Sequence, residues 1–345
     1  MLIMNYHTFE VSYRLTASEK DRYTDILFRS NGKSYYDKNS SVPTLVCNTL
    51  TPYGITIKLI KFEKNDFPYY ALCYRINPRR IIESYDYIGL FNAKDTDMML
   101  KKADEYVLPL KLPSVHDCRI SRIDFCANIK MSGQHEIFEY IKLLQRGRYP
   151  SNYTPSLYYD LISKRNKHHK NSVKISHKKL LDVVYYNKYD QLKENPLCQN
   201  IDEAENILRA EIQCKKRKVK HLMDKFGCTS VRSFLKHSDK IGTYVFKQYA
   251  NKFYGGGDFY KLDEIYRRID NSKFKDKSKK KMTELVQLSA KHKSLDTALH
   301  KLSWDKATKN KMLKKFDKIG VSPVVIPLRS EYEFFKNPLT LALNA

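Results

Sequence analysis

Alternating apolar and polar positions dominate the first half of the chain and predict β-strands there. The segments concerned are rich in β-branched and aromatic residues and are bounded by turn residues. They span residues 53–62, 69–76, 106–112 and 118–129, and the same pattern returns at 179–189 and 206–215. We therefore expect a mainly antiparallel sheet.

Helical spacing of apolar residues interrupts these strands and later replaces them. Residues 77–91 predict a turn and a short helix, and residues 133–147 predict an amphipathic helix. From about residue 217 to 320 the pattern is helical. The chain is thus expected to be an α+β protein, with flanking helices around the sheet of a first domain, 1–225, and a smaller, mainly helical domain, 226–345.

The net charge of the chain indicates what kind of partner it binds. Lys and Arg number 63 against 38 Asp and Glu, so the formal net charge is +25. A basic excess of this size, spread along the chain, indicates a polyanion and first of all nucleic acid. An anionic membrane is the weaker alternative, because no basic segment accompanies an apolar helical face.

Three basic segments, 163–179, 215–220 and 273–281, are expected to contact phosphates, although the last could also be a solvated loop. His168 and His169 fall in the first segment, and we interpret them as part of a DNA-contacting loop rather than as metal ligands. The basic residues expected to bind DNA are Arg79, Arg80, Lys164, Arg165, Lys167, Lys170, Lys215, Lys216, Arg217, Lys218, Lys279, Lys280 and Lys281.

The seven cysteines are odd in number, scattered, and never spaced C-x-x-C. This pattern argues against a disulfide framework or a structural zinc site, and it favours a reducing compartment. The chain has no apolar run near 18 residues and no signal peptide after Met1. We therefore expect a cytoplasmic protein.

Two predicted strands each carry an arginine and a carboxylate on the face opposite their apolar residues. Side chains alternate along a strand, so parity shows which residues face together. In SRIDFCAN these are Arg122 and Asp124, and in LRAEIQC they are Arg209 and Glu211.

A third segment, DVVYYNK, adds a phenol and an ammonium group. Tyr186 and Lys188 share one face of this strand, and Tyr185 takes the other. Because tyrosine has an ordinary pKa of about 10, it becomes a nucleophile only where a cation or a metal favours its phenolate. Lys188, two residues further on, is placed to help.

If these three strands are neighbours, their combined face suits phosphodiester cleavage. Asp124 and Glu211 would hold a hard divalent cation, Mg²⁺ or Mn²⁺, that polarises and orients a phosphate. Arg122 and Arg209 would balance the charge that develops on the phosphoryl oxygens. The structural alternative is that these residues are cross-strand ion pairs on the exposed face of an antiparallel sheet, which are common.

At these motifs the chain resembles the gene II type of replication protein of filamentous phages, a family of rolling-circle initiator endonucleases. The similar segments keep the order found in that family. They span residues 70–95, 120–129, 180–192, 207–227 and 320–328. The Tyr-Asn-Lys spelling is also similar to the nicking segment of one class of plasmid initiators.

The resemblance implies that Tyr186 is the nucleophile and that Asp124 and Glu211 bind the metal. It implies an enzyme that nicks one strand of origin DNA, stays attached to the 5′ phosphate, leaves a 3′ hydroxyl and later rejoins the ends. The first domain would cut, and the helical domain would bind the origin duplex. Double- and single-stranded origin DNA would be the partners, with host helicase and polymerase as further candidates, in the bacterial cytoplasm.

Several alternatives stay open at this stage. Tyr185 and Tyr189 crowd the segment, so a shifted or a second active tyrosine is compatible with the sequence. The His-hydrophobic-His metal motif of a larger class of initiators is absent. A plasmid initiator or conjugative relaxase with the same chemistry is the closest alternative function, and a non-catalytic DNA-binding regulator is the alternative from another class.

Overall fold

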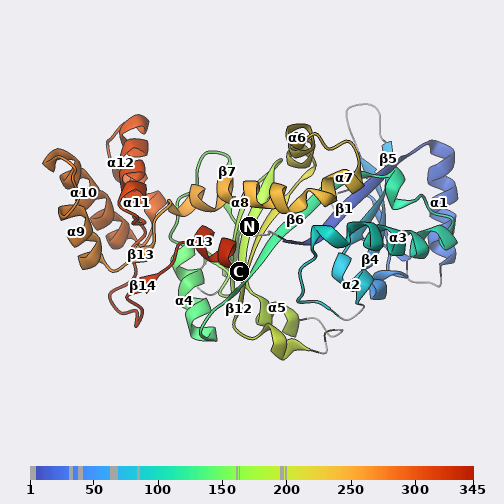
Figure 1. The fold of residues 1–345 in the computed structure, drawn as a ribbon, viewed down its shortest axis with the longest axis horizontal. Coiled ribbons are helices and arrows are strands. Elements are labelled where there is room, and N and C mark those ends of the chain that lie inside the picture. The colour runs from blue at the N-terminus through green and yellow to red at the C-terminus, as the bar shows by residue number, and fades with distance from the viewer. Residues whose placement is uncertain are drawn as a thin grey trace.

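The computed structural model describes residues 5–30, 34–37, 42–62, 69–83, 86–160, 162, 164–194, 198 and 200–345. These residues form an α+β protein, as predicted, with a large sheet and a largely helical C-terminal region (Figure 1). Ten strands of the described residues make one antiparallel sheet in the order β2-β3-β4-β5-β1-β6-β12-β11-β10-β7.

The strands of this sheet are β1 (Asn5–Leu15), β2 (Ser34–Tyr36), β3 (Thr44–Cys47), β4 (Ile55–Phe62), β5 (Tyr69–Ile76), β6 (Arg119–Lys130), β7 (Tyr153–Pro155), β10 (Ser172–His177), β11 (Leu181–Asn187) and β12 (Ile207–Cys214). Two small ribbons pair β8 (Leu157–Asp160) with β9 (Arg165–His168), and β13 (Phe259–Tyr260) with β14 (Phe334–Phe335).

The helices are α1 (Ala17–Arg29), α2 (Pro78–Ile82), α3 (Thr96–Val107), α4 (Gln134–Leu144), α5 (Lys188–Lys193), α6 (Lys216–Phe226), α7 (Val231–Lys236), α8 (Ser238–Tyr254), α9 (Leu262–Asp270), α10 (Asp276–His292), α11 (Leu295–Lys301), α12 (Lys306–Lys318) and α13 (Pro338–Asn344).

Most of the predicted strands are confirmed. The segments 53–62, 69–76, 118–129 and 206–215 form β4, β5, β6 and β12, with ends that differ by at most two residues. These segments combine β-branched or aromatic residues with a clear period of two, so local pattern and tertiary packing agree.

The strand predicted at 106–112 is wrong. Its first residues complete α3, and the segment Leu108–Leu110 forms a single 3₁₀ turn. Four buried residues of α3, Met99, Leu100, Ala103 and Val107, follow helical spacing. An amphipathic helix that begins at Thr96 therefore extends into the segment, and the alternation of its last residues has no partner strand to pair with.

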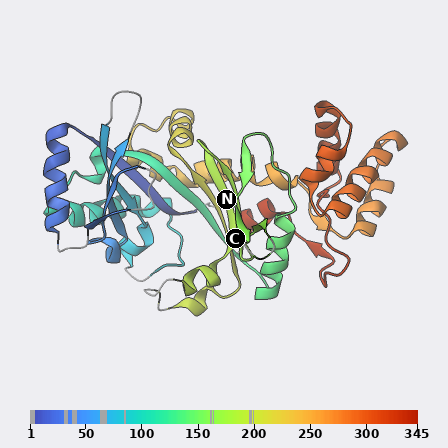
Figure 2. The same ribbon diagram turned by 180° about the vertical axis from the view of Figure 1, so that it is seen from behind.

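One face of the central sheet is covered and the other is open. Helix α8 crosses the sheet in front of the strands in Figure 1, and the strands lie in front of it in the view from behind (Figure 2). Apolar residues on the covered side include Phe125, Ile212 and Tyr185, each at most 1% exposed. The polar residues between them in sequence face the open side, because side chains alternate along a strand.

The C-terminal helices differ in what they contact. Helices α7 and α8 pack against α3 and β1, and α13 returns to α8 and β6. Helices α9–α12 gather at one end of the molecule (Figure 1). Buried side chains of the sheet and of these helices nevertheless form one continuous cluster. The domain division at 225/226 stays a prediction.

Two of the basic segments have regular structure where loops were expected. Segment 163–179 contributes β9 and β10, so His168 lies in a strand and not in the predicted loop, whereas His169 lies in the turn between the two strands. Segment 273–281 runs into α10, which begins at Asp276. In the described parts of the chain, no helix is both long and apolar enough to cross a membrane.

Candidate active site

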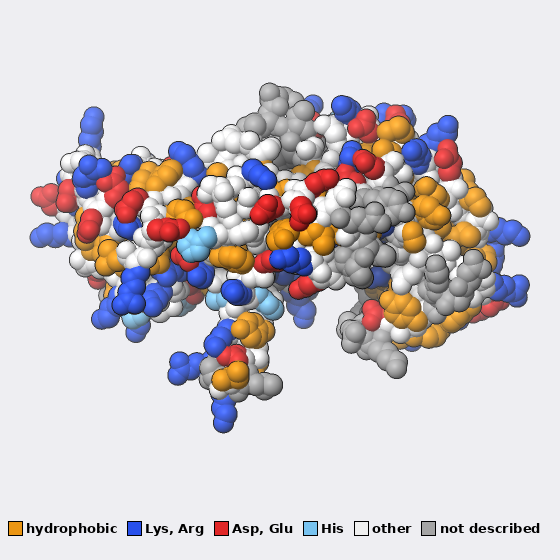
Figure 3. Space-filling model, turned by 90° about the horizontal axis from the view of Figure 1, so that it is seen from below, with side chains coloured by type: hydrophobic (Ala, Val, Ile, Leu, Met, Phe, Trp, Pro, Cys, Tyr) orange, Lys and Arg blue, Asp and Glu red, His pale blue; other side chains and the backbone are white. Residues whose placement is uncertain are grey.

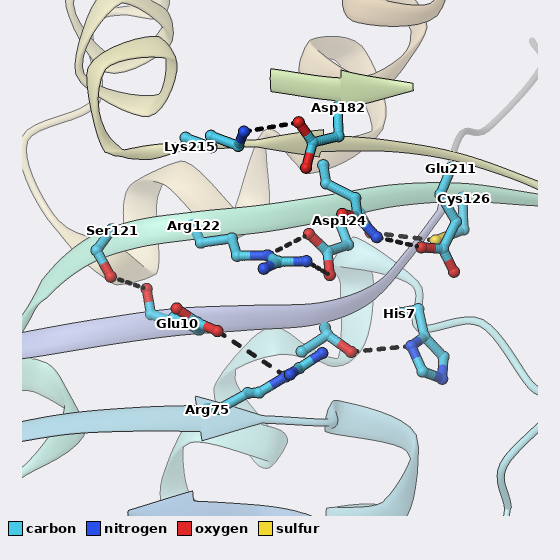
Figure 4. A network of polar contacts seen from close by, with 12 residues as sticks. His7, Glu10, Arg75, Ser121, Arg122, Asp124, Cys126, Asp182, Glu211 and Lys215 are labelled. Carbon is cyan, nitrogen blue, oxygen red and sulfur yellow. Dashed lines mark hydrogen bonds and ion pairs between the residues drawn. The ribbon is translucent and has the colours of Figure 1, made fainter. Parts of the chain in front are cut away.

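The sheet register brings two acidic residues together on the open face. Strand β6 lies between β1 and β12, with Asp124 opposite Gln213 and Cys126 opposite Glu211. Asp124 and Glu211 are therefore diagonal neighbours on adjacent strands, roughly 7 to 8 Å apart between Cα atoms by ordinary sheet geometry. Figure 4 shows both carboxylates on the same side of the sheet.

Of the three tyrosines in the segment 180–192, Tyr186 faces these carboxylates. Its hydroxyl donates a hydrogen bond to Glu211 Oε1 at 2.6 Å. Tyr185 points to the covered side, is 1% exposed and packs edge-on against Tyr254 with ring centroids 6.1 Å apart. Tyr189 lies in α5, where Lys193 Nζ sits 4.1 Å from its ring centroid. The phenol at 186 is thus the one that hydrogen-bonds to a site carboxylate.

Asp124 is held by an arginine from its own strand. Arg122 donates from Nε to Oδ1 at 2.8 Å and from Nη2 to Oδ2 at 3.0 Å, a two-point ion pair. Asp124 is 3% exposed. Burial raises the pKa of its carboxyl above the ordinary value, Arg122 opposes this, and the charge of Glu211 raises the pKa further. The two acids therefore interact electrostatically.

Both carboxylates are engaged within the protein, which bears on metal binding. Besides the tyrosine hydrogen bond, Glu211 accepts one from Gln213 Nε2 at 2.9 Å. Among the described residues, no three or more His, Cys, Asp or Glu side chains are arranged to hold a metal. A carboxylate offers about four lone-pair positions, so these hydrogen bonds leave acceptor capacity. Asp124 and Glu211 thus fit a Mg²⁺ site completed by water and a substrate phosphate, as such sites commonly are.

The phenol of Tyr186 is strongly biased towards its protonated form. Burial of its hydroxyl raises its pKa well above the ordinary value, the negative charge of Glu211 raises it further, and Arg209 lowers it. Tyr186 therefore acts as a hydrogen-bond donor in this structure. A phenolate at Tyr186 would form only if the charge on Glu211 were reduced or shared.

Arg209 lies opposite Tyr186 in the sheet register but does not line the cavity beside these residues. It is fully buried, donates from Nε to Asn128 Oδ1 at 2.8 Å, and donates from Nη2 to the Ile88 carbonyl. Its Nη1 is buried without a hydrogen-bond partner among the described residues. Arg209 adds positive charge to the site and lowers the pKa of Tyr186, and its contact with a phosphate stays a prediction.

Lys188 does not continue the strand as parity suggested. Asn187 caps α5 through its side-chain oxygen, which accepts from the Tyr189 and Asp190 N–H groups, so a helix begins at Lys188. The Lys188 side chain is 2% exposed, and its Nζ donates to Gln191 Oε1 at 2.7 Å and not to Tyr186. Burial, and next the charge of Arg209, lower the pKa of Lys188 to about 7.

This pKa predicts how stability depends on pH. Near pH 7, Lys188 is about half protonated in the folded chain and fully protonated in the unfolded chain. The unfolded state therefore binds more protons, and the free energy of unfolding rises with pH. Between pH 7 and 8.5 we expect a rise of about 1.5 kcal/mol relative to Lys188→Met.

The measurement is urea unfolding of the two proteins at several pH values, with Lys193→Met on the exposed side of α5 as the control. The pH stays at or below 8.5, because burial raises the pKa of thiols such as Cys126, which makes unfolding easier at higher pH. Parallel pH profiles of wild type and Lys188→Met would show that Lys188 is charged in the folded protein.

His7 is a site residue that sequence patterns did not reveal. The register of β1 against β6 shifts between Tyr6 and Thr8, so His7 is the extra residue of a β-bulge. It lines the same cavity as Asp124, its Nδ1 lies 2.8 Å from Thr8 Oγ1, and burial lowers its pKa well below the ordinary value, followed by the charges of Arg209 and Lys188. A bulge breaks the alternation on which parity depends, which is why no sequence signal pointed to it.

These residues surround a cavity of about 610 Å³ on the open face, the site cavity. Its walls come from β1, β6, β11, β12, α5 and the segment 169–172. Beyond the Arg122–Asp124 ion pair lies a larger hollow of about 1120 Å³, the sheet groove, along β1, β5 and β6. Its basic and aromatic lining residues are Arg14, Arg119, Arg122, Lys215, Lys216, Tyr13, Phe62 and Tyr69.

Some of the basic residues predicted to bind DNA are exposed, whereas others are buried or already paired with residues of the protein. Lys216 and Arg217 are exposed at the start of α6. Lys215 pairs with Asp182 at 2.6 Å, and Lys218 is 3% exposed with its Nζ on Gln248 Oε1 at 3.2 Å. Lys218 is therefore not available to a phosphate in this conformation.

Arg79 and Arg80 also have partners within the protein. Arg79 pairs with Asp86 at 2.7 Å and with Glu83 at 3.0 Å. Arg80 is 8% exposed and stacks on Tyr87 at 4.3 Å. These contacts account for the positions of both arginine side chains without DNA.

The other predicted DNA-binding residues lie on two separate elements. Lys164, Arg165, Lys167 and Lys170 are exposed on or beside the β8–β9 ribbon. On α10, Lys280 is exposed, Lys279 donates to the Asp270 carbonyl at 2.7 Å, and Lys281 lies 5.2 Å from the Trp304 ring. Their roles in DNA binding stay predictions.

Comparison with known proteins adds little to this geometry. No protein-family model matches the chain, and no curated protein matches it. Among solved structures, the fold is similar to that of the rolling circle replication initiator protein from Geobacillus stearothermophilus, with a TM-score of 0.38 and 11% sequence identity over 95% of this chain and 99% of that one. A likeness at this TM-score carries no argument about activity, and the resemblance to the gene II family stays a prediction.

Proposed function

We propose that the protein is a DNA strand-transfer enzyme that nicks one strand of origin DNA through Tyr186 to start rolling-circle replication, and later rejoins the ends. The observation that carries the proposal is the 2.6 Å hydrogen bond from the Tyr186 phenol to Glu211, on a sheet face that also presents Asp124. A phenol beside two carboxylates in an open cavity on a basic protein suits attack on a nucleic-acid phosphate.

In the proposed reaction, the Tyr186 oxygen attacks the phosphorus of the scissile phosphodiester. The new oxygen–phosphorus bond forms as the bond from phosphorus to the 3′ oxygen breaks. The phenol loses its proton through Glu211, which accepts its hydrogen bond, and the departing 3′ oxygen gains a proton from water. The products are a 5′ phosphotyrosine ester and a free 3′ hydroxyl, and attack by that hydroxyl on the ester reverses the step.

Asp124 and Glu211 are the residues that would hold the divalent cation, Mg²⁺ or Mn²⁺, which when bound polarises the scissile phosphate. Arg122 keeps the Asp124 carboxylate oriented, and buried Arg209 lowers the pKa of Tyr186. The roles of Arg122 and Lys188 are to keep positive charge beside the reacting phosphate. Since Lys188 has a pKa of about 7, it holds that charge only below neutral pH.

The sheet groove provides a path for the single strand. Its arginines and lysines suit phosphates, and Phe62 and Tyr69 form a stacked pair with centroids 5.1 Å apart. Base stacking on aromatic rings within a basic groove is the usual way to hold a single strand without reading its sequence. The groove begins where Arg122 meets Asp124, so a strand lying in it would lead into the site cavity.

A second candidate function is a non-catalytic DNA-binding regulator. It is favoured by the fact that each carboxylate already has protein partners, as expected of structural ion pairs on a sheet. Such a protein would keep the basic groove and need neither a metal nor a reactive phenol.

One experiment separates the two functions. The purified chain is incubated with Mg²⁺ or Mn²⁺ and supercoiled plasmids that carry the DNA flanking its gene. The enzyme is expected to convert supercoils into open circles with protein attached to a 5′ end, and EDTA should prevent this. Intact supercoils in the presence of demonstrable DNA binding would favour the regulator.

A further inference from the structure

The β8–β9 ribbon stands apart from the large sheet. Within the described structure, its two four-residue strands pair with each other and not with the large sheet. The space-filling view shows a narrow projection at this place, in which Lys and Arg side chains surround hydrophobic ones (Figure 3). An isolated two-stranded ribbon is at best marginally stable in water, so a projecting one is usually kept for a contact.

The ribbon exposes large apolar side chains that a folded chain normally buries. Leu157, Tyr158 and Tyr159 are 39%, 42% and 58% exposed, and Ile162 is 96% exposed. Exposed aromatic residues gathered in one place mark an interaction surface. The ribbon therefore needs a partner that accepts aromatic rings.

The charge of the ribbon indicates the chemistry of that partner. Lys164, Arg165 and Lys167 are exposed, and the acidic residue beside them, Asp160, forms an ion pair with Lys167. Aromatic rings interleaved with basic side chains match unstacked bases and their phosphates. An apolar protein surface would match the rings but not the cations.

The ribbon is anchored at the rim of the site cavity. The segment 169–172, which follows β9, lines that cavity together with Tyr186 and Asp124. Gln145 Nε2 fixes this segment by donating to the carbonyls of His169 and Ser172 at 2.8 and 3.1 Å. The base of the ribbon therefore lies at the edge of the cavity that holds the candidate nucleophile.

The two tyrosines face opposite sides of the ribbon. Tyr158 pairs with Lys167 and shares its face, whereas Tyr159 pairs with Asn166 on the other face. A ribbon with one aromatic ring on each side can contact two separate strands at once. The junction between duplex and single-stranded DNA presents two strands in this way.

We propose that the β8–β9 ribbon is a strand-separating wedge, which enters duplex DNA beside the candidate site and directs one strand into the site cavity. That the directed strand is the one to be nicked rests on the proposed function. The opening of the duplex does not. Four residues of strand span roughly 13 Å, and base pairs are spaced about 3.4 Å apart along the duplex. The ribbon is therefore long enough to keep the two strands apart over about four base pairs.

The test uses a forked oligonucleotide of mixed sequence with 2-aminopurine at successive base pairs from the junction, and the full chain carrying Tyr186→Phe so that no strand is cut. The chain should raise the fluorescence of roughly the first four pairs. The double variant Tyr158→Ala/Tyr159→Ala should lose this rise and bind the fork about 10- to 100-fold more weakly. Affinity for a single strand should fall less, because one strand occupies one face of the ribbon and stacks on one of the two rings.

Two further variants control for loss of stability and of bulk. Tyr158→Phe/Tyr159→Phe keeps the rings and should open the fork as well as the starting protein. Tyr35→Ala/Tyr36→Ala removes another exposed tyrosine pair, 51% and 60% exposed on β2 at the far end of the sheet, and should have no effect.

Persistent opening by the double alanine variant would overturn the proposal. So would an equal loss of affinity for fork and single strand, a change in oligomeric mass, or tyrosine-dependent binding to anionic vesicles in place of the fork. If the fork opens but the plasmid assay shows no nicking, the wedge proposal stands and the proposed nicking activity is wrong. Nicking with no tyrosine-dependent opening would do the reverse.

Discussion

Tyr186→Phe is expected to abolish the covalent adduct between the protein and DNA while leaving DNA binding within about twofold of wild type. The substitution removes only the oxygen that donates to Glu211 and that would attack phosphorus, and the ring still packs on the sheet. Loss of the nucleophile of an enzyme commonly lowers the rate by about 10⁴-fold or more, so the residual adduct should be undetectable.

The measurement follows from the direction of attack. The protein would stay on the 5′ phosphate, so a strand labelled at its 3′ end is used, and the adduct is detected as a denaturation-resistant shift. Tyr185→Phe is the matched control, because that hydroxyl is buried without a hydrogen-bond partner in the described structure and faces the covered side of the sheet. An adduct that survives Tyr186→Phe would assign the nucleophile to Tyr185 or Tyr189.

Asp124→Asn and Glu211→Gln are each expected to remove metal-dependent nicking and the stabilisation of the chain by Mg²⁺. Both substitutions keep the size of the side chain and remove the negative charge that a hard cation requires. At a Mg²⁺ concentration about 100 times its Kd, bound metal would add about 2.7 kcal/mol to the free energy of unfolding. The thermal shift on adding Mg²⁺ tests binding without reference to catalysis.

Asp182→Asn controls for the loss of a buried strand carboxylate outside the site cavity. Asp182 is 6% exposed and pairs with Lys215 and Lys174 at 2.6 and 3.2 Å, so its loss should lower stability without changing the Mg²⁺ shift. If Asp124→Asn and Glu211→Gln keep both the Mg²⁺ shift and the nicking rate, the carboxylates are structural. If the shift disappears but nicking persists, the cation is not part of the reaction.

The polar face of the site could be predicted because alternation is a local property of the backbone. A strand of L-residues places successive side chains on opposite sides whatever its neighbours are. The apolar residues beside Asp124, Glu211 and Tyr186 indicated which side must be buried, and the structure has all three on the other side. The same argument fails where the backbone departs from a regular strand, as it does at His7 and Lys188.

The sequence by itself determined the α+β class, the basic character and the side of each strand on which the candidate residues lie, because composition and side-chain alternation need no distant partner. Tertiary structure decided which strands are neighbours, since the order β1-β6-β12-β11 pairs residues far apart in the chain, such as Arg209 and Asn128. It also decided that a bulge brings His7 into the cavity, and that the segment following an exposed ribbon lines its rim. These features arise from pairing energies between distant segments, which no local pattern records.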